Sequence, residues 1–479
     1  MGTASVNGDA PVVVVGGGPV GLSAAMLLAR DGHEVIVLEK DDTPPPASGL
    51  EAWNCWQRSG VAQFRQAHFM QARFRHVLDA ELPAVRDEIE ASGGRRFNMV
   101  DALPPSIEDR APREGDDRFE TILARRPVLE SAFARVAART PGVTVRRGVA
   151  VEGPIAGQSR NGVPHVAGVR TTEGEEIRAS LVVDAMGRRS ALPEWVAAVG
   201  ARPVHEEALD AGFIYYSRHF ASRTGSLPEV RGPIVTSLDS LKVVTMPSDN
   251  QSWTFVIAAF AGDQPLKALR QNATWEKVIG AIPHIAHWLD GEPLTDVLPM
   301  AGVMDRYRRL VVDGHPVVTG LLPVGDAWAC TNPQAGRGVA LGLSQTQLLR
   351  DSAREATLDD PVQLALTYDR LTEETLTPWY RQQVDGDRAR AAEVQALIAG
   401  QPRAEAEGDP RHQMQAAFFA AAAVDPVVAR AMIEVASCLA LPQAIMARPG
   451  MAERVAPFFG ARPGFTPGPT RSELLALLN

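Results

Sequence analysis

Residues 12–21, VVVVGGGPVG, decide the fold of this chain. The four valines form a continuous β-branched run, which is typical of a parallel strand buried on both faces. The turn from Gly16 to Gly21 has the spacing G-x-G-x-x-G, and the Ala- and Leu-rich segment 22–30 is typical of a helix packed against a sheet. The apolar segment 34–39, EVIVLE, completes a predicted strand–helix–strand unit.

Each glycine of this turn has a physical role in binding a dinucleotide. Gly16 permits the tight turn, Gly18 lets the backbone approach a pyrophosphate, and Gly21 allows helix and strand to pack closely. The helix N-terminus offers free N–H groups and a positive dipole end to phosphates. Glu39 ends the second strand 18 residues after Gly21, where a carboxylate can accept both hydroxyls of an adenosine ribose. The pattern therefore predicts FAD or NAD.

The composition excludes several classes of protein. A chain of 479 residues, 45% hydrophobic and 22% charged, is globular and large enough for two or three structural units. Its net charge of −9 disfavours nucleic acid as a partner. Cys55, Cys330 and Cys438 are scattered, which predicts no disulfide framework and no metal site and fits a reducing compartment. Residues 1–10 lack signal-peptide features and the apolar run 416–424 is too short for a membrane span, so we expect a cytoplasmic protein.

The pattern of apolar and polar residues changes twice along the chain. Residues 181–184 and 322–325 have the pattern of further strands of the first sheet, whereas alternating runs between 205 and 300 predict an antiparallel sheet. After about residue 340 only helical spacing remains. We therefore predict a cofactor domain in two parts, 1–204 and 301–380, a β-sheet substrate domain at 205–300, and a helical C-terminal region at 381–479, with about 70–125 as a further contribution to the substrate domain.

Two later motifs extend the pattern of the glycine turn. Arg126-Pro-Val-Leu-Glu precedes a helical run, and Gly325-Asp326 ends a strand and is followed by Pro333, Gly336 and Gly338. In this order, the three segments resemble the FAD-dependent monooxygenase superfamily that has the para-hydroxybenzoate hydroxylase fold. The resemblance covers most of residues 10–380. It implies an α/β fold with a Rossmann-like (GR2-type) FAD-binding domain, an inserted antiparallel substrate domain and a helical C-terminal region.

The resemblance also implies roles for individual residues. Asp326 would bond the ribityl chain, the Gly336 and Gly338 N–H groups would face the flavin ring or phosphates, and Arg126 would lie near the ribityl–pyrophosphate arm. The implied FAD-binding set is Gly16, Gly18, Gly21, Glu39, Lys40, Arg58, Arg126, Asp326, Pro333, Gly336 and Gly338.

Departures from the superfamily pattern point to one branch of it. Met186 replaces the aspartate of the A-D-G-x-x-S segment, which in single-component hydroxylases serves FAD and the nicotinamide, and Ala329 replaces the histidine of G-D-A-A-H. Residues 325–338, GDAWACTNPQAGRG, instead resemble styrene monooxygenases and polyether-type flavin epoxidases. With no second glycine-rich unit for NADPH, we expect a separate reductase to supply reduced flavin, so that NAD(P)H acts indirectly.

The chemistry implied is oxygen transfer. Reduced FAD would react with O₂ to give a C4a-hydroperoxide, which inserts one oxygen atom into a hydrophobic substrate by epoxidation of an alkene or hydroxylation of an aromatic ring. Epoxidation needs no side-chain acid or base, so no catalytic residue is assigned. Asn332, Pro333 and His68 are catalytic candidates, and Tyr215, Tyr216 and Met246 are candidates for the wall of the substrate pocket.

Two alternatives remain open. One is an FAD-dependent C=C reductase or dehydrogenase of the geranylgeranyl reductase type, and the other is a binding protein like the Rab GDP-dissociation inhibitors. The glycine turn, Glu39 and Asp326 argue against the second, because a scaffold would not need them. Only four of the 48 basic residues are lysines, which is compatible with a GC-rich bacterial source and a role in secondary metabolism.

Overall fold

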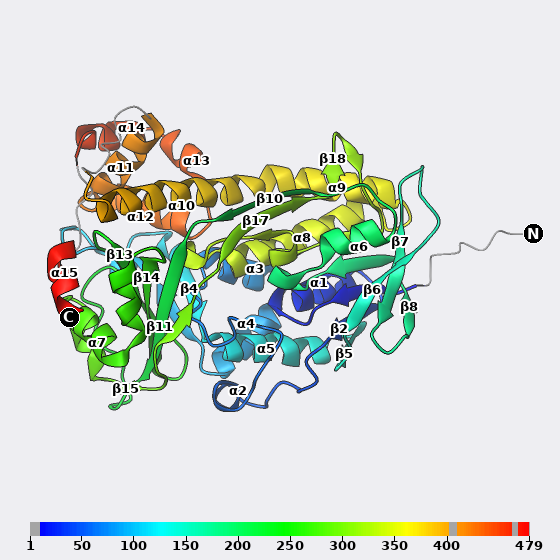
Figure 1. The fold of residues 1–479 in the computed structure, drawn as a ribbon, viewed down its shortest axis with the longest axis horizontal. Helices are drawn as coiled ribbons and strands as arrows, with labels where there is room; N and C mark the ends of the chain where they lie inside the picture. The colour runs from blue at the N-terminus through cyan, green and yellow to red at the C-terminus, as the bar shows by residue number, and fades with distance from the viewer. Residues whose placement is uncertain (1–9, 402–409, 462–467, 479) are drawn as a thin grey trace, which may run out of the picture.

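The computed structural model describes residues 10–401, 410–461 and 468–478 (Figure 1). Residues 1–9 and 479, at the ends of the predicted first and last units, lie outside the described residues, as do 402–409 and 462–467. A parallel sheet lies toward one end of the molecule and an antiparallel sheet toward the other, with the long helix α10 (Thr377–Ile398) along one side.

The parallel sheet confirms the predicted strand–helix–strand unit and its two later strands. Its order is β20–β9–β1–β2–β5, and every neighbouring pair is parallel. Because the carboxyl ends of parallel strands share one edge, the glycine turn, Glu39 and Gly325 lie along the same edge. The strands are β1 (Val12–Val15), β2 (Val35–Glu39), β5 (Val143–Arg147), β9 (Leu181–Asp184) and β20 (Leu321–Pro323).

Both faces of this sheet are covered, which explains the uninterrupted valine run. Val12 and Val14 join a core with helices α1, α5 and α8, whereas Val13 and Val15 join a core with a three-stranded sheet and α6. The bounds are α1 (Pro19–Arg30), α5 (Arg126–Ala138), α6 (Leu192–Ala198), α8 (Gly338–Ala356), β6 (Val151–Ala156), β7 (Val166–Thr171) and β8 (Glu176–Arg178).

The segment between β2 and α5 is tied to the antiparallel sheet. Arg125 and Asp249 form a buried ion pair in which the Arg125 backbone N–H also donates to Asp249 Oδ1 at 2.7 Å. Asn250 N donates to Gly93 O at 3.0 Å. The elements of this segment are α2 (Gly49–Asn54), α3 (Ala72–Glu81), α4 (Pro83–Ala91), and the antiparallel pair β3 (Arg95–Asn98) and β4 (Glu120–Leu123).

The alternating runs between 205 and 300 form the antiparallel sheet that they predict, in the order β12–β13–β14–β11–β15 with β16 also on β11. One face packs on α7 (Asn272–Gly280) and α15 (Arg471–Leu477), through Trp275 and Leu474. The strands are β11 (Phe213–Ala221), β12 (Val235–Ser237), β13 (Leu241–Pro247), β14 (Ser252–Phe260), β15 (Glu292–Pro293) and β16 (Leu298–Met300).

A second antiparallel ribbon connects the two sheets. It has the order β10–β17–β21 and brings the chain back from the antiparallel sheet to the parallel one. The strands are β10 (His205–Asp210), β17 (Met304–Arg309) and β21 (Ala329–Cys330), and the hairpin β18 (Val311–Val312) and β19 (His315–Pro316) follows β17.

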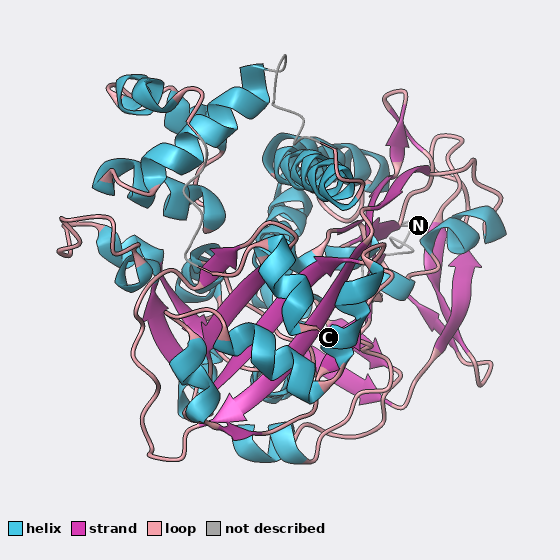
Figure 2. Ribbon diagram, turned by 60° about the vertical axis from the view of Figure 1, so that its left-hand side comes forward, coloured by secondary structure: helices cyan, strands magenta, loops and turns pink. Residues whose placement is uncertain are grey.

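The remainder of the described chain is helical, as predicted. Figure 2 shows α10 seen nearly end-on beside the group of C-terminal helices. In the described residues no single helix is long and apolar enough to cross a membrane. Helices α11 and α12 reach the necessary length and apolar composition only when they are counted together, and the chain bends by 117° between them. The helices are α9 (Pro361–Thr375), α10, α11 (Pro410–Ala422), α12 (Pro426–Ala436), α13 (Pro442–Met446), α14 (Met451–Val455) and α15.

Candidate functional site

A single continuous cavity of about 2480 Å³ follows the carboxyl edge of the parallel sheet and extends to the antiparallel sheet. Sites for drug-sized ligands are usually about 300–1,000 Å³, so this cavity has room for two large ligands. One end is lined by the glycine turn and the other by β11, β13, β14 and α10.

Two helix N-termini without side-chain caps face this cavity. Gly18 is the N-cap of α1 and Arg337 that of α8, and neither helix has a side-chain cap bond. Gly16 has φ of +116°, and an added Cβ would lie 2.4 Å from Ala185 O; at Gly21 it would lie 2.1 Å from Gly16 O. At Gly18 it would meet nothing within 4 Å. Gly16 and Gly21 are thus required by chain packing, whereas Gly18 keeps space open where a phosphate would approach.

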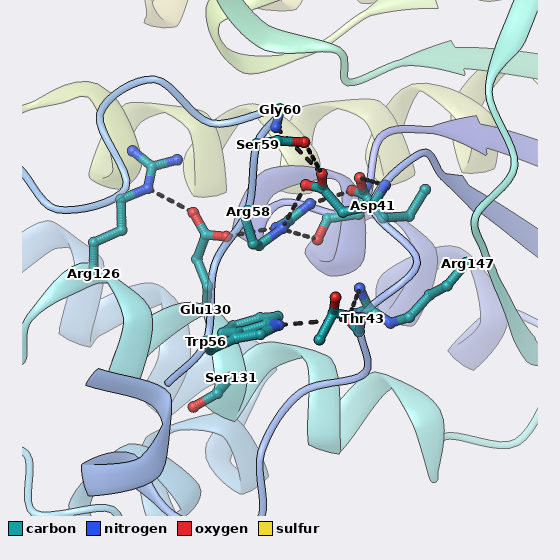
Figure 3. Close-up of polar contacts among 12 residues, drawn as sticks. Asp41, Thr43, Trp56, Arg58, Ser59, Gly60, Arg126, Glu130, Ser131 and Arg147 are labelled. Atoms are coloured by element: carbon teal, nitrogen blue, oxygen red, sulfur yellow. Dashed lines mark hydrogen bonds and ion pairs between the residues drawn. The ribbon is translucent and has the colours of Figure 1, made fainter. Parts of the chain in front are cut away.

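Arg58 is held by three carboxylates beside the glycine turn (Figure 3). Its Nη2 pairs with Glu39, its Nε lies 3.2 Å from Asp41 Oδ2, and its Nη1 lies 2.5 Å from Glu130 Oε2. Burial lowers the pKa of the guanidinium, but the charges of Glu130 and Glu39 outweigh this and raise it. Glu39 also accepts from Gly17 N at 2.8 Å, so the carboxylate predicted to face an adenosine ribose has a fixed orientation.

Arg126 and His68 continue this network along the cavity. Arg126 Nε lies 2.5 Å from Glu130 Oε1, and Arg126 Nη1 lies 2.7 Å from His68 Nε2. His68 Nδ1 lies 2.9 Å from the carbonyl oxygen of Gln66, so the hydrogen-bond pattern assigns the proton to Nδ1 and leaves Nε2 as an acceptor. Burial and the charge of Arg126 lower the pKa of His68 to about 3. His68 is therefore a neutral acceptor that orients Arg126.

Asp326 follows the end of β20 and lines the same cavity. It pairs with Arg188, whose Nε lies 3.3 Å from Asp326 Oδ2 and whose Nη2 donates to Thr331 O at 3.3 Å. Both side chains line the cavity. The sequence reasoning missed Arg188, although it stands two residues after Met186, in the segment that the resemblance singled out.

The loop 332–338 leads into α8 and contributes residues to the cavity wall. Pro333, Gly336 and Gly338 line the cavity, and Gly336 has a φ of +63°, which favours glycine, and an added Cβ would lie 3.0 Å from Phe69 O. Asn332 does not line it: its side chain is buried and accepts a hydrogen bond from Tyr215 Oη. The remaining predicted cofactor residue, Lys40, does line the cavity.

The substrate-wall prediction needs one correction. Tyr215 and Met246 line the cavity, but Tyr216 does not, because successive side chains of a strand point to opposite faces. Tyr216 instead packs with Trp275 in the core on the other face of the antiparallel sheet. The sequence identified the strand but not which of two adjacent tyrosines faces the ligand.

Helix α10 is the largest contribution that the sequence reasoning missed. Its residues Gln383 and Asp387 line the cavity, as do Lys242 of β13 and Gln334 of the 332–338 loop. Lys242 lies 92 positions from Gln334 in sequence, and no local pattern joins them. Among the described residues, no group of three or more His, Cys, Asp or Glu side chains is arranged to hold a metal ion.

The backbone N–H groups and charged side chains of this cavity fit a dinucleotide. The comparison with known families identifies which dinucleotide it is. Residues 9–352 match the family described as FAD binding domain. The chain belongs to this family. This match identifies FAD as the dinucleotide that the family binds.

Known proteins similar to this chain are distant in sequence. Protein Rv3254 of Mycobacterium tuberculosis is 26% identical over 399 residues, which cover 78% of this chain and 79% of that protein. The flavin-dependent brominase Bmp2 is 16% identical, with a TM-score of 0.61 over 94% of this chain and 98% of that one. PqsL of Pseudomonas aeruginosa, a probable FAD-dependent monooxygenase, is 16% identical, with a TM-score of 0.55 over 81% and 99%. At these identities the solved structures show a shared fold.

Proposed function

We propose that this flavoprotein transfers one oxygen atom from O₂ to a hydrophobic organic substrate, by hydroxylation of an aromatic ring or epoxidation of an alkene. The observation that carries the proposal is the continuity of the cavity between the glycine turn and the apolar chamber at β11, β13 and β14. A substrate in this chamber would reach a flavin held at the loop 332–338 without crossing solvent.

The predicted cofactor residues have chemistry that suits FAD. The backbone N–H groups at the start of α1 would hold the pyrophosphate, Glu39 the adenosine ribose and Asp326 the ribityl hydroxyls, while the start of α8 would face the ring. Lys40 would supply positive charge to the phosphates, whereas Arg58 and Arg126 are already paired with carboxylates and would act as hydrogen-bond donors held in place by them. FAD, when bound and reduced, supplies the activation of O₂.

The chamber supports a mostly apolar substrate. Met246, Val256 and Ala258 line it, and they join a core with Tyr215 and Phe213. Such a wall excludes water, which protects a reactive oxygenated species from loss to solvent.

A separate reductase remains part of the proposal. Met186, at the position where single-component hydroxylases have an aspartate, lines the cavity and offers no charge to a nicotinamide. The three free cysteines support a reducing, cytoplasmic setting.

A rapid-mixing experiment tests the proposal. Purified protein is reconstituted with FAD, photoreduced without oxygen and mixed with oxygenated buffer while absorbance is recorded. A transient band that precedes the return of oxidised flavin supports oxygen transfer. Direct return to oxidised flavin, with no oxygen incorporated into alkene or aromatic probes, contradicts the proposal and favours a C=C reductase.

A further inference from the structure

The cavity has a third part that the proposed oxygen transfer does not use. It lies where the segment that begins with the short 3₁₀ helix η1 (Met99–Ala102) meets α11 and α12, and we call it the C-terminal compartment. Leu103 and Ile433 belong to one hydrophobic core, so the wall after η1 and the wall from α12 pack against each other. The side chains that define the compartment, all of which line the cavity, are Met99, Leu103, Ala416, Phe419, Met432 and Ile433.

Polar contacts fix the helical walls of this compartment to the rest of the chain. Arg430 Nη2 of α12 lies 2.9 Å from Asp116 Oδ2, and both side chains are buried. The same guanidinium donates to Ala111 O at 2.8 Å. Ser106 Oγ donates to Ala423 O, just after α11, at 2.6 Å. Because loss of either partner of a buried ion pair is strongly destabilising, these contacts hold α12 in place and the compartment is a built part of the fold.

The six side chains of the compartment are all apolar. Gln413 and Gln415, at the start of α11, also line the cavity but are exposed, so they form a polar rim. Arg390 and Glu393 line it as well, and they pair with each other at 2.6 Å. A polar group buried against an apolar wall without a hydrogen bond is unfavourable. The compartment therefore favours hydrocarbon over sugars, nucleotides and ions.

Phe419 marks the opening of this compartment to solvent. Its side chain is 46% exposed although it lines the cavity, and Val424, just after α11, is 47% exposed. Large apolar side chains that gather on an exposed rim are typical of places where apolar ligands make contact. An apolar ligand can therefore enter beside α11, at a distance in the fold from the glycine turn.

The volume of the cavity exceeds what a flavin and a small substrate need. The cavity measures about 2480 Å³, whereas sites for drug-sized ligands reach about 1,000 Å³. FAD and a reacting ring or alkene would leave several hundred Å³ unfilled. An apolar cavity of this kind does not attract water, so the remaining space is available to an apolar group.

We propose that the C-terminal compartment binds the hydrocarbon chain of an elongated substrate, whose reacting ring or alkene lies in the chamber at β11, β13 and β14. This rests on the proposed oxygen transfer and selects alkyl-substituted aromatics and long-chain alkenes among its substrates. Each buried methylene group adds affinity without a directional contact. Met99 and Met432 are flexible side chains that can adjust to a chain, which favours a chain over a second rigid ring system.

A pair of homologous probes tests this proposal without turnover. The FAD-loaded enzyme is titrated by calorimetry with acetophenone and with octanophenone, which carry the same ring and carbonyl group and differ by six methylene groups. A methylene fully removed from water tightens binding about four-fold, so even partial burial should make octanophenone bind about thirty-fold or more tightly than acetophenone. Calorimetry does not depend on any change in the flavin.

Ala416→Trp fills the compartment from α11 and should reduce this preference by about ten-fold or more, while the affinity for acetophenone changes by less than about two-fold. Met432→Trp fills it from α12 and should have the same effect, which provides a second variant if the first does not fold. Ala452→Trp is the matched control, because Ala452 is exposed on α14 and does not line the cavity. It should keep the wild-type preference. FAD content, measured for each variant, distinguishes loss of this compartment from loss of the cofactor.

Equal binding of the two probes by the wild type, including binding of neither, overturns the proposal. So does a preference for octanophenone that survives in a folded Ala416→Trp or Met432→Trp protein, because the chain then lies elsewhere in the cavity. Failure of oxygen transfer is separately visible. In that case the rapid-mixing experiment shows direct return of oxidised flavin, while the wild type still prefers octanophenone and the two filled variants do not.

Discussion

Arg58 Nη1 lies 2.5 Å from Glu130 Oε2, and both side chains are almost fully buried. The other oxygen of the same carboxylate lies 2.5 Å from Arg126 Nε. Glu130 on α5 therefore orients two arginines that line the cavity, one from the loop after α2 and one from its own helix. Because charges buried without partners are costly, this carboxylate links the shape of the cavity near the glycine turn to the stability of the fold.

Glu130→Gln should lower the free energy of unfolding by about 3 kcal/mol, because it leaves two arginines without their shared counter-charge. Glu90→Gln is the control: Glu90 pairs with exposed Arg96 at 2.7 Å, and its loss should cost less than about 1 kcal/mol. Urea unfolding of the three proteins, followed by fluorescence, measures both changes. Equal losses would show that Glu130 is not a buried charge anchor.

Gly18→Ala and Gly21→Ala should separate cofactor binding from folding. At Gly21 an added Cβ lies 2.1 Å from Gly16 O, so the variant should lose about 2 kcal/mol of stability or more. At Gly18 the Cβ meets no protein atom within 4 Å, so the loss of stability should be limited to the N-cap effect, about 1 kcal/mol or less, but FAD should bind roughly ten-fold more weakly because the backbone can no longer approach the pyrophosphate.

Unfolding curves and FAD titrations of both variants check this expectation. Gly153→Ala, where an added Cβ also meets nothing within 4 Å and which does not line the cavity, should change neither quantity. Unchanged FAD affinity in Gly18→Ala would remove this turn from the cofactor site.

The parallel sheet and the glycine turn that lines one end of the cavity could be predicted because their signals are local. The valine run, the glycine spacing and Glu39 lie within 28 residues of each other, and the strand period fixes what each element buries. Strand β11 was equally visible, but its register was not, and Tyr216 was placed on the wrong face for that reason.

The end of the cavity at β11 and α10 could not be predicted because its contacts join distant parts of the chain. Tyr215 and Asn332 are 117 positions apart, and Asp387 is one of three acidic residues in a helix that also carries several arginines. Only the packing of α10 over the cavity distinguishes Asp387 from its exposed neighbour Asp385.

His68 should remain neutral throughout the physiological range. Its burial and the charge of Arg126 lower its pKa to about 3, so it should carry no charge at pH 5 to 8, with the proton on Nδ1. Nitrogen NMR of imidazole-labelled protein, with His68→Gln to assign the signal, measures the ionisation and the tautomer. A signal that titrates near pH 6.5 would contradict the assigned network.

The stability of the FAD-loaded protein should depend on pH through Asp387. Its pKa in the folded state, about 7, lies above the usual 3.8 because of burial and Asp305. Between these values the folded state retains a proton that the unfolded state has lost, so this group stabilises the fold at low pH and the free energy of unfolding falls as the pH rises toward 7.

The groups that face Asp387 are Lys242 on β13, Asp305 on β17 and Tyr215 on β11, and burial raises the pKa of this tyrosine well above its usual value, so it stays neutral here. Asp387→Asn cannot ionise and should therefore gain about 2 kcal/mol relative to the wild type between pH 5 and pH 8. Urea unfolding at four pH values measures the gain, with Asp385→Asn as the exposed control that should follow the wild-type curve. Parallel curves for Asp387→Asn and the wild type would mean that this carboxylate ionises as freely in the fold as it does in water, which would contradict its raised pKa.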